Sequence, residues 1–68
     1  MITKDFGLRV KKLRTQMGLS QEKFALQIGI DRTYLASIEK GMRNVSLVNL
    51  EKIANGFHIS LSDLFMGL

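Results

Sequence analysis

The chain has 68 residues, which is enough for one domain and too few for two, and it contains no cysteine and a single histidine. A disulfide framework is therefore excluded, and the ligands of a structural zinc site are missing. Hydrophobic residues make up 46% of the sequence, so we expect a small packed core. We expect no metal, no cofactor and no enzymatic activity, because no nucleophile–base pair or paired carboxylates can be assembled.

Charge is distributed unevenly along the chain. Ten Lys and Arg residues oppose six Asp and Glu, for a net charge of +4. Residues 1–40 carry eight basic and four acidic groups, whereas residues 41–68 are neutral. A basic balance in a small domain favours nucleic acid or an anionic surface as the partner. A solvated basic face without a partner is the alternative that charge alone leaves open.

The N-terminal residues contain an early acid and no long apolar stretch, so a targeting signal is not expected. No segment approaches the roughly 20 apolar residues of a membrane-spanning helix. We therefore expect the protein to lie in a reducing cytoplasm.

Apolar residues at helical spacing predict five short helices and no strand. The first helix carries Phe6, Val10, Leu13 and Met17 on one stripe and ends at Gly18. The second is expected between an N-cap at Ser20 and Gly29, and the third between an N-cap at Asp31 and Gly41.

The fourth helix is expected to start at the N-cap Ser46 and to end at Asn55-Gly56, with an apolar side of Leu47, Leu50, Ile53 and Ala54. A last short helix begins after Ser60 or Ser62 and carries Leu61, Leu64 and Phe65. The segment 56–60 is the best strand candidate, but it is too short to build a sheet.

Residues 19–41 have the pattern of a helix, a tight turn and a second helix. Ala25 is small enough for a helix crossing, Gly29 tolerates positive φ in the turn, and Ile30 supplies an apolar residue just after it. Leu35 and Ile38 are expected to face inward from the second helix of this pair. Its outer positions Arg32, Thr33, Ala36 and Ser37 then form the face that a helix-turn-helix inserts into the major groove.

This segment resembles the helix-turn-helix of the phage repressor and Cro family. Leu19-Ser20-Gln21-Glu22, followed by Ala25 and Gly29, matches the family's entry into the motif, and Ile38-Glu39-Lys40-Gly41 matches its exit. Within the family, Asp31-Arg32-Thr33-Tyr34 followed by Arg43-Asn44 and Ser46-Leu47 is most similar to the controller proteins of restriction–modification systems.

The resemblance covers nearly the whole chain and implies an all-α, lambda-repressor-like domain: a compact bundle of five short helices in which the second and third form the helix-turn-helix. It implies a regulator of transcription that binds double-stranded operator DNA. The residues implied to contact DNA are Ser20, Gln21, Arg32, Thr33, Tyr34, Ser37, Arg43 and Asn44.

The resemblance assigns these residues different tasks. Gln21, and more weakly Ser20, would bind a phosphate, whereas Arg32 would bind guanine O6 and N7. Thr33, Tyr34 and Ser37 would contact base edges or phosphates. Arg43 and Asn44 would contact the DNA backbone or the nearby minor groove. A structural ion pair between Arg14 and Glu39 is also implied, so Arg14 is not counted as a DNA contact.

Dimer formation is expected on physical grounds, because one recognition helix reads only a few base pairs. The neutral, apolar C-terminal segment, about residues 55–68 of a single 1–68 domain, is the expected interface. Its central residues are Leu61, Leu64, Phe65 and Met66.

The function favoured by the sequence is that of a controller that regulates its own and neighbouring genes, and other functions are alternatives. A phage or mobile-element repressor shares the same framework, and an antitoxin-like module would use the apolar C-terminus for another protein. A peripheral membrane helix is disfavoured, because the stripe of the first helix is needed for the core. Activation of transcription would require RNA polymerase as a further partner. The operator, the target genes and the sign of regulation are not encoded in any motif.

Overall fold

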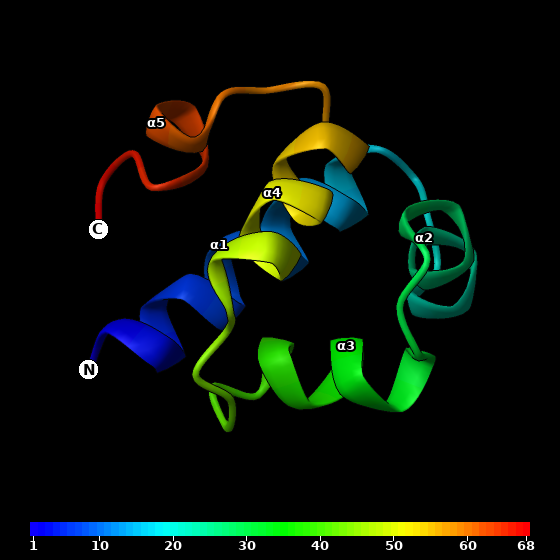
Figure 1. Cartoon of the computed structure of the whole chain (residues 1–68), viewed down its shortest axis with the longest axis horizontal. Coiled ribbons are helices and arrows are strands. Elements are labelled where there is room, and N and C mark those ends of the chain that lie inside the picture. The colour runs from blue at the N-terminus through cyan, green and yellow to red at the C-terminus, as the bar shows by residue number, and fades with distance from the viewer.

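The computed structural model describes all 68 residues and consists of five helices without strands (Figure 1). The helices are α1 (Ile2–Gln16), α2 (Gln21–Ile28), α3 (Arg32–Glu39), α4 (Leu47–Gly56) and α5 (Leu61–Leu64). α1 packs against α3, α2 packs against both α3 and α4, and α5 packs against α4. The all-α, five-helix architecture predicted from the sequence is confirmed. None of the helices combines the length and apolarity that crossing a membrane requires.

The helix starts follow the predicted N-caps. Ser20 Oγ accepts a hydrogen bond from the backbone N–H of Lys23, and Ser46 Oγ accepts one from Asn49. At the start of α5 the cap is Ser60, not Ser62, and it binds the N–H of Asp63. Each hydroxyl satisfies a backbone donor that the first turn of a helix leaves unpaired.

The first four helices end at or just before the predicted glycines, but only three of these glycines take a positive φ. Gly18, Gly29 and Gly41 take positive φ angles of 71°, 75° and 77° as their helices end. At α4 the positive φ, 58°, belongs to His58, whereas Gly56 is the last helical residue. Residue 56 is a glycine for a packing reason: a Cβ there would collide with the side chains of Ile28 and Phe24. Gly56 therefore allows α2 and α4 to approach each other.

Ten buried hydrophobic residues form the core. They are Phe6, Val10, Phe24, Ala25, Leu35, Ile38, Ile53, Ala54, Phe57 and Leu64. The rings of Phe24 and Phe57 stack with their centroids 4.4 Å apart, which joins α2 to the end of α4. Ala25, Leu35 and Ile38 lie where the sequence pattern predicted.

Two residues predicted to face the core are exposed. α1 ends at Gln16, so Met17 leaves the helix and Arg14 occupies the buried position one turn after Val10. Leu47 lies in the first turn of α4 and is 72% exposed, because the buried side of that helix begins only at Leu50.

The short helix α5 closes the core with Leu64, which is completely buried. The Arg9 guanidinium of α1 donates hydrogen bonds to the carbonyl oxygens of Asp63 at 2.8 Å and Leu64 at 3.2 Å. Phe65 packs on Phe6 with ring centroids 5.5 Å apart. Placing Leu64 in a dimer interface was therefore wrong: its side chain is used entirely within its own domain. Leu61, like Phe65, is half-buried and packs against the core.

Candidate nucleic-acid interface

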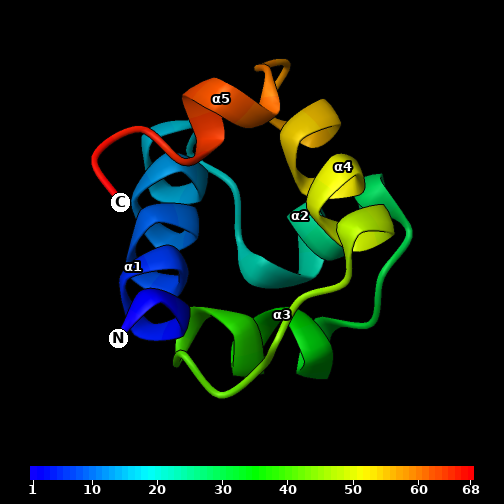
Figure 2. The ribbon, with the colours of Figure 1, turned by 60° about the vertical axis from the view of Figure 1, so that its left-hand side comes forward.

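The helix α3 lies along one edge of the molecule, with its outer side uncovered by other helices (Figure 2). Asp31 caps its start, where Oδ2 accepts the backbone N–H groups of Thr33 at 3.0 Å and Tyr34 at 3.3 Å. Leu35 turns into the core, whereas Arg32 and Thr33 are exposed. The N-terminal turn of α3 thus presents a cation and a hydroxyl outward from a rigid base.

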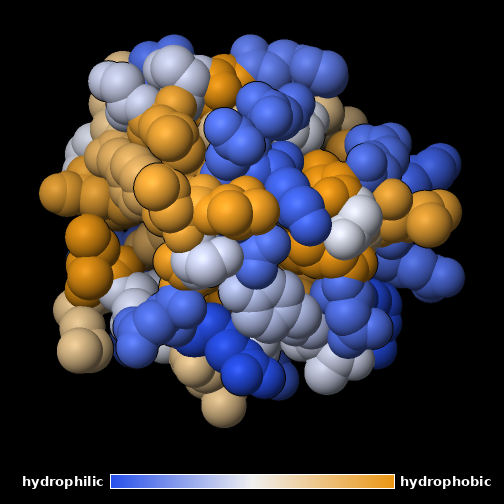
Figure 3. All heavy atoms as spheres, viewed as in Figure 1, coloured by the Kyte–Doolittle hydropathy of each residue, from blue (hydrophilic) through white to orange (hydrophobic).

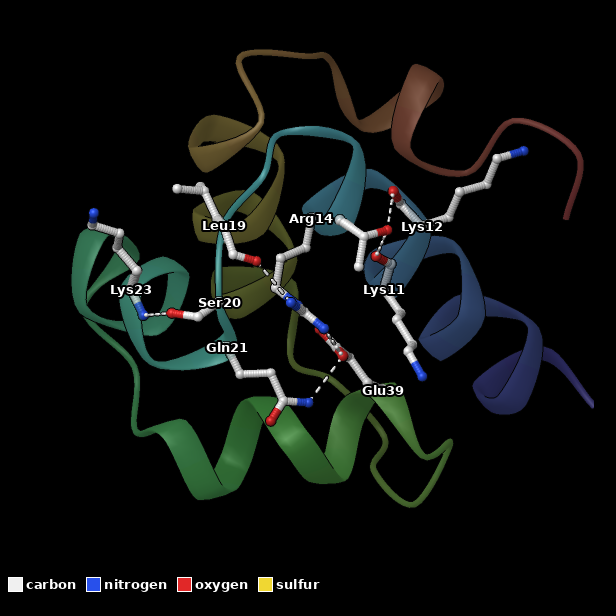
Figure 4. A network of polar contacts seen from close by, with 9 residues as sticks. Lys11, Lys12, Arg14, Leu19, Ser20, Gln21, Lys23 and Glu39 are labelled. Atoms are coloured by element: carbon white, nitrogen blue, oxygen red, sulfur yellow. Dashed lines mark hydrogen bonds and ion pairs between the residues drawn. The ribbon is translucent and has the colours of Figure 1, made fainter.

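A buried ion pair fixes the other end of α3 (Figure 4). Arg14 Nε donates to Glu39 Oε2 at 2.7 Å, and Arg14 Nη2 donates to Oε1 at 2.9 Å. A third donor, Nη1, binds the carbonyl oxygen of Leu19 at 2.8 Å. The hydrogen bonds and the negative charge of Glu39 raise the pKa of Arg14 despite its burial. The ion pair implied by the resemblance is present and joins α1 to α3. The bond to Leu19 also ties Arg14 to the turn just before α2.

Gln21 extends this network to the first residue of α2. Its Nε2 donates to Glu39 Oε1 at 3.0 Å, and the amide oxygen points away from the ion pair (Figure 4). The amide nitrogen has a second N–H, so Gln21 can bind a phosphate while Glu39 holds it. Ser20, beside it, uses its hydroxyl oxygen to cap α2.

A second cluster of polar side chains follows α3 toward the α3–α4 loop. Ser37 Oγ donates to the carbonyl oxygen of Tyr34 at 2.6 Å and accepts from Arg43 Nε at 3.0 Å. The Arg43 guanidinium lies 5.7 Å from the centre of the Tyr34 ring, within the range of a cation–π contact. On the far side, Asn49 Nδ2 donates to the Tyr34 hydroxyl at 3.2 Å.

These contacts refine the roles expected for the individual residues. Arg32, Thr33, Arg43 and Asn44 are exposed, and Tyr34 and Ser37 are half-buried beside them. The single hydroxyl proton of Ser37 is used within α3, so Ser37 has no donor for a base edge. Asn49 was missed, since its position in an expected first helical turn carries no signal of a contact with Tyr34.

No group of His, Cys, Asp and Glu side chains is arranged to hold a metal ion. What the arrangement offers instead is a row of cationic and hydrogen-bonding groups along one helix and the loop after it. Such a row can bind phosphates and base edges, and its spacing is set by the network around Glu39 and by the contacts of Tyr34 and Ser37.

The comparisons with known proteins agree with this architecture. The chain belongs to the helix-turn-helix family, whose model matches residues 10–64. It is 64% identical over 61 residues to the control protein C.MunI of Mycoplasma sp, covering 88% of this chain and 82% of that protein. It is 43% identical over 60 residues to the control protein C.BamHI of Bacillus amyloliquefaciens, covering 87% and 74%.

Solved structures show the same relationship. The restriction–modification controller protein C.AhdI from Aeromonas hydrophila superposes with a TM-score of 0.89 at 48% identity, covering 93% of this chain and 96% of that one. The controller protein C.Esp1396I, solved as a tetramer in complex with its natural 35-base-pair operator, superposes with a TM-score of 0.87 at 32% identity, covering 96% and 86%. The family resemblance noted in the sequence is confirmed.

Proposed function

We propose that this chain is a DNA-binding transcriptional regulator of the controller type, which binds an operator as a homodimer and regulates its own and neighbouring genes of a restriction–modification system. The observation that carries the proposal is the outward face of α3, where Arg32 and Thr33 stand exposed at the N-terminal end of a rigidly held helix. Two networks fix this helix, and no large hydrophobic side chain of α3 is exposed. The similarity to controller proteins supports the same role.

Seven of the eight candidate residues have a definite part in this proposal, and the eighth, Ser20, caps α2 beside Gln21. Arg32 binds a guanine through its two-pronged guanidinium, and Thr33 contacts the neighbouring base. Gln21 and Tyr34 donate to phosphates, and Arg43 with Asn44 binds the backbone beside α3. Ser37 serves the interface by holding Arg43 and has no base contact of its own.

The homodimer would form through an apolar face on which α4, α5 and the termini meet. Hydrophobic atoms gather over the left-hand side of the view in Figure 3, whereas the lower edge, where α3 lies, is largely polar. The exposed hydrophobic residues on these segments are Met1, Ile2, Leu47, Val48, Met66 and Leu68. Ile2 also lines a hollow of about 270 Å³, together with Thr3, Phe6, Arg43, Asn44, Val45, Leu50 and Phe65.

Such a face differs from the interface expected from the sequence. Of the four residues expected there, Leu61, Phe65 and Met66 have exposed surface and Leu64 has none, and the start of α4 adds Leu47 and Val48. A two-fold axis through this face would present two copies of α3 to DNA, and half-sites about one helical turn apart, roughly 34–36 Å, suit such a dimer. As a DNA-binding regulator the protein would act in the cytoplasm on the nucleoid, and it would have no enzymatic activity.

Footprinting on the DNA upstream of its own gene tests the proposal. We expect protection of a sequence with two related half-sites, and binding that weakens with salt by a slope of about −0.9 per phosphate neutralised. The Arg32→Ala variant serves as the matched control and should protect the same site only at higher concentration. Binding that does not depend on salt would contradict the proposal. If the protein left DNA unshifted in a gel and instead pulled down an unrelated protein, a protein-interaction module would be favoured.

A further inference from the structure

A hydrogen bond that the Tyr34 hydroxyl accepts from Asn49 joins the proposed DNA-binding surface to α4. None of the candidate DNA-binding residues belongs to α4. A tyrosine hydroxyl has one proton to donate and two lone pairs. Asn49 Nδ2 occupies one lone pair at 3.2 Å, and because it is a donor, the tyrosine proton must point elsewhere. Both side chains are half-buried, so their positions are restricted by packing as well as by this bond.

Tyr34 in turn places Arg43 from two directions. Its ring faces the guanidinium at 5.7 Å, and its backbone carbonyl accepts the proton of Ser37, whose oxygen is thereby turned to accept Arg43 Nε at 3.0 Å. In the loop before α4, none of residues 43–46 donates a backbone–backbone hydrogen bond. Arg43 is nevertheless exposed, and its Nη1 and Nη2 groups form no bond within the protein.

We propose that Asn49 is a positioning residue for DNA binding, which acts through Tyr34 to hold the Arg43 guanidinium with its two terminal nitrogens directed outward. The assignment rests on the function proposed above and adds a residue that does not touch DNA. An unrestrained arginine on a loop loses side-chain entropy when it binds a phosphate, and Asn49 reduces that loss by ordering the side chain beforehand. Since Asn49 lies on α4 next to Val48 and Leu50, the same helix would serve both the dimer face and the DNA-binding loop.

The experiment is a pair of double-mutant cycles on the full chain. Asn49→Leu removes the donor at nearly constant volume, Tyr34→Phe removes the acceptor, and Arg43→Ala removes the positioned group. Affinity is titrated against the footprinted operator duplex and a random duplex of equal length. Sedimentation and urea unfolding are recorded for each variant. Asn55→Leu is the matched control, because it makes the same change at an exposed position of the same helix.

In the wild-type background we expect Asn49→Leu to weaken operator binding by about three- to ten-fold, the effect of one neutral hydrogen bond. In the Tyr34→Phe and Arg43→Ala backgrounds the same substitution should change affinity less than two-fold, because the chain of contacts is already broken. Asn55→Leu should leave binding unchanged. Asn49→Asp should weaken binding at least as much as Asn49→Leu. The carboxylate would accept a hydrogen bond from the Tyr34 O–H, which could then no longer donate to a phosphate, and it would add a negative charge near the loop.

Three outcomes overturn the inference in distinguishable ways. Additive losses in both cycles, with wild-type binding intact, would show that Asn49 acts independently of Tyr34 and Arg43, and the proposed function would stand. An Asn49→Leu variant that loses affinity only in proportion to lost dimer would assign Asn49 to the interface instead. Wild-type protein that binds the operator no better than random DNA would overturn the proposed function and this inference together.

Discussion

Arg14 on α1 and Glu39 at the end of α3 form a buried, two-pronged ion pair, with 2.7 Å between Nε and Oε2 and 2.9 Å between Nη2 and Oε1. The two residues are 8% and 7% exposed. Because the pair joins the longest helix to the recognition helix, the orientation of α3 depends on a contact that lies well away from its DNA-binding side.

Removing one partner of this pair should be costly. Glu39→Gln keeps the shape of the side chain but leaves the Arg14 charge buried without an opposite charge, which costs about 3–5 kcal/mol in comparable sites. Urea unfolding followed by circular dichroism measures the loss. Glu22→Gln, at an exposed position of α2, is the control and should change stability by less than about 0.5 kcal/mol. Equal effects of the two substitutions would show that the pair contributes no special stability.

The double substitution Arg14→Met with Glu39→Leu provides a second check on the same contact. Replacing both charges by hydrophobic groups avoids an uncompensated charge, so the double variant should be more stable than Glu39→Gln. The double variant should still bind DNA less well than the wild type, because Gln21 loses the Glu39 oxygen that positions its amide.

The dimer face should respond to a charge placed at its edge. Val48→Asp or Met66→Asp is expected to give a folded monomer with weakened operator binding, since both side chains are largely exposed within one chain. Sedimentation at micromolar concentration measures the oligomeric state. Leu26→Asp is the matched control, because Leu26 is 80% exposed and belongs to α2, which lies on the opposite side of the molecule from α5 and the two termini in Figure 1. A dimer that survives both test substitutions would place the interface elsewhere.

Leu64 should behave as a core residue. Leu64→Ala leaves a cavity where a fully buried side chain stood, and the expected cost is about 2–5 kcal/mol. Leu64→Asp should fail to fold. Thermal unfolding at several protein concentrations separates this loss from a dimerisation effect, since an interface residue would shift the midpoint most at low concentration.

Base recognition should depend on Arg32 and general affinity on Arg43. Arg32→Ala is expected to cost about 1–3 kcal/mol on the operator and to relax discrimination at one base position in each half-site. Arg43→Ala should weaken operator and random DNA by similar factors and lower the salt slope by about one. Titrations against the operator, its single-base variants and a random duplex distinguish these patterns. If Arg32→Ala retained wild-type base preferences, base recognition would have to be assigned to Thr33 or Tyr34.

The end of α4 offers a test by backbone conformation. His58 has a φ of 58°, a region that costs a non-glycine residue about 1 kcal/mol or more. His58→Gly should therefore raise the urea midpoint, whereas Gly56→Ala should lower it by forcing apart α2 and α4. If Gly56→Ala were instead the stabilising change, the close approach of the two helices would not constrain that position.

The features predicted correctly from the sequence are those that local chemistry determines. Ser20, Asp31 and Ser46 act as caps because their side chains bind backbone groups two or three residues away. Gly29 adopts the left-handed conformation that the tight turn requires.

The errors concern residues whose environment is set by distant segments. Leu64 and Met66 look alike as apolar residues near the end of the chain, and only the packing of α5 determines which is buried. Gly56 ends α4 as predicted, but its packing role depends on Ile28 and Phe24 of another helix, which the local pattern does not show. The bond between Asn49 and Tyr34 joins residues fifteen positions apart, and no periodic pattern announces it.

The division of labour along α3 bears on how such a regulator could acquire a new target sequence. Leu35, Ile38 and Glu39 are committed to packing or to the ion pair, and Tyr34 and Ser37 are engaged with Asn49 and Arg43. Arg32 and Thr33 have side chains with no bond to the rest of the protein and can change without loss of stability. Divergence between related lineages, or directed evolution toward another operator, should therefore begin at these two positions.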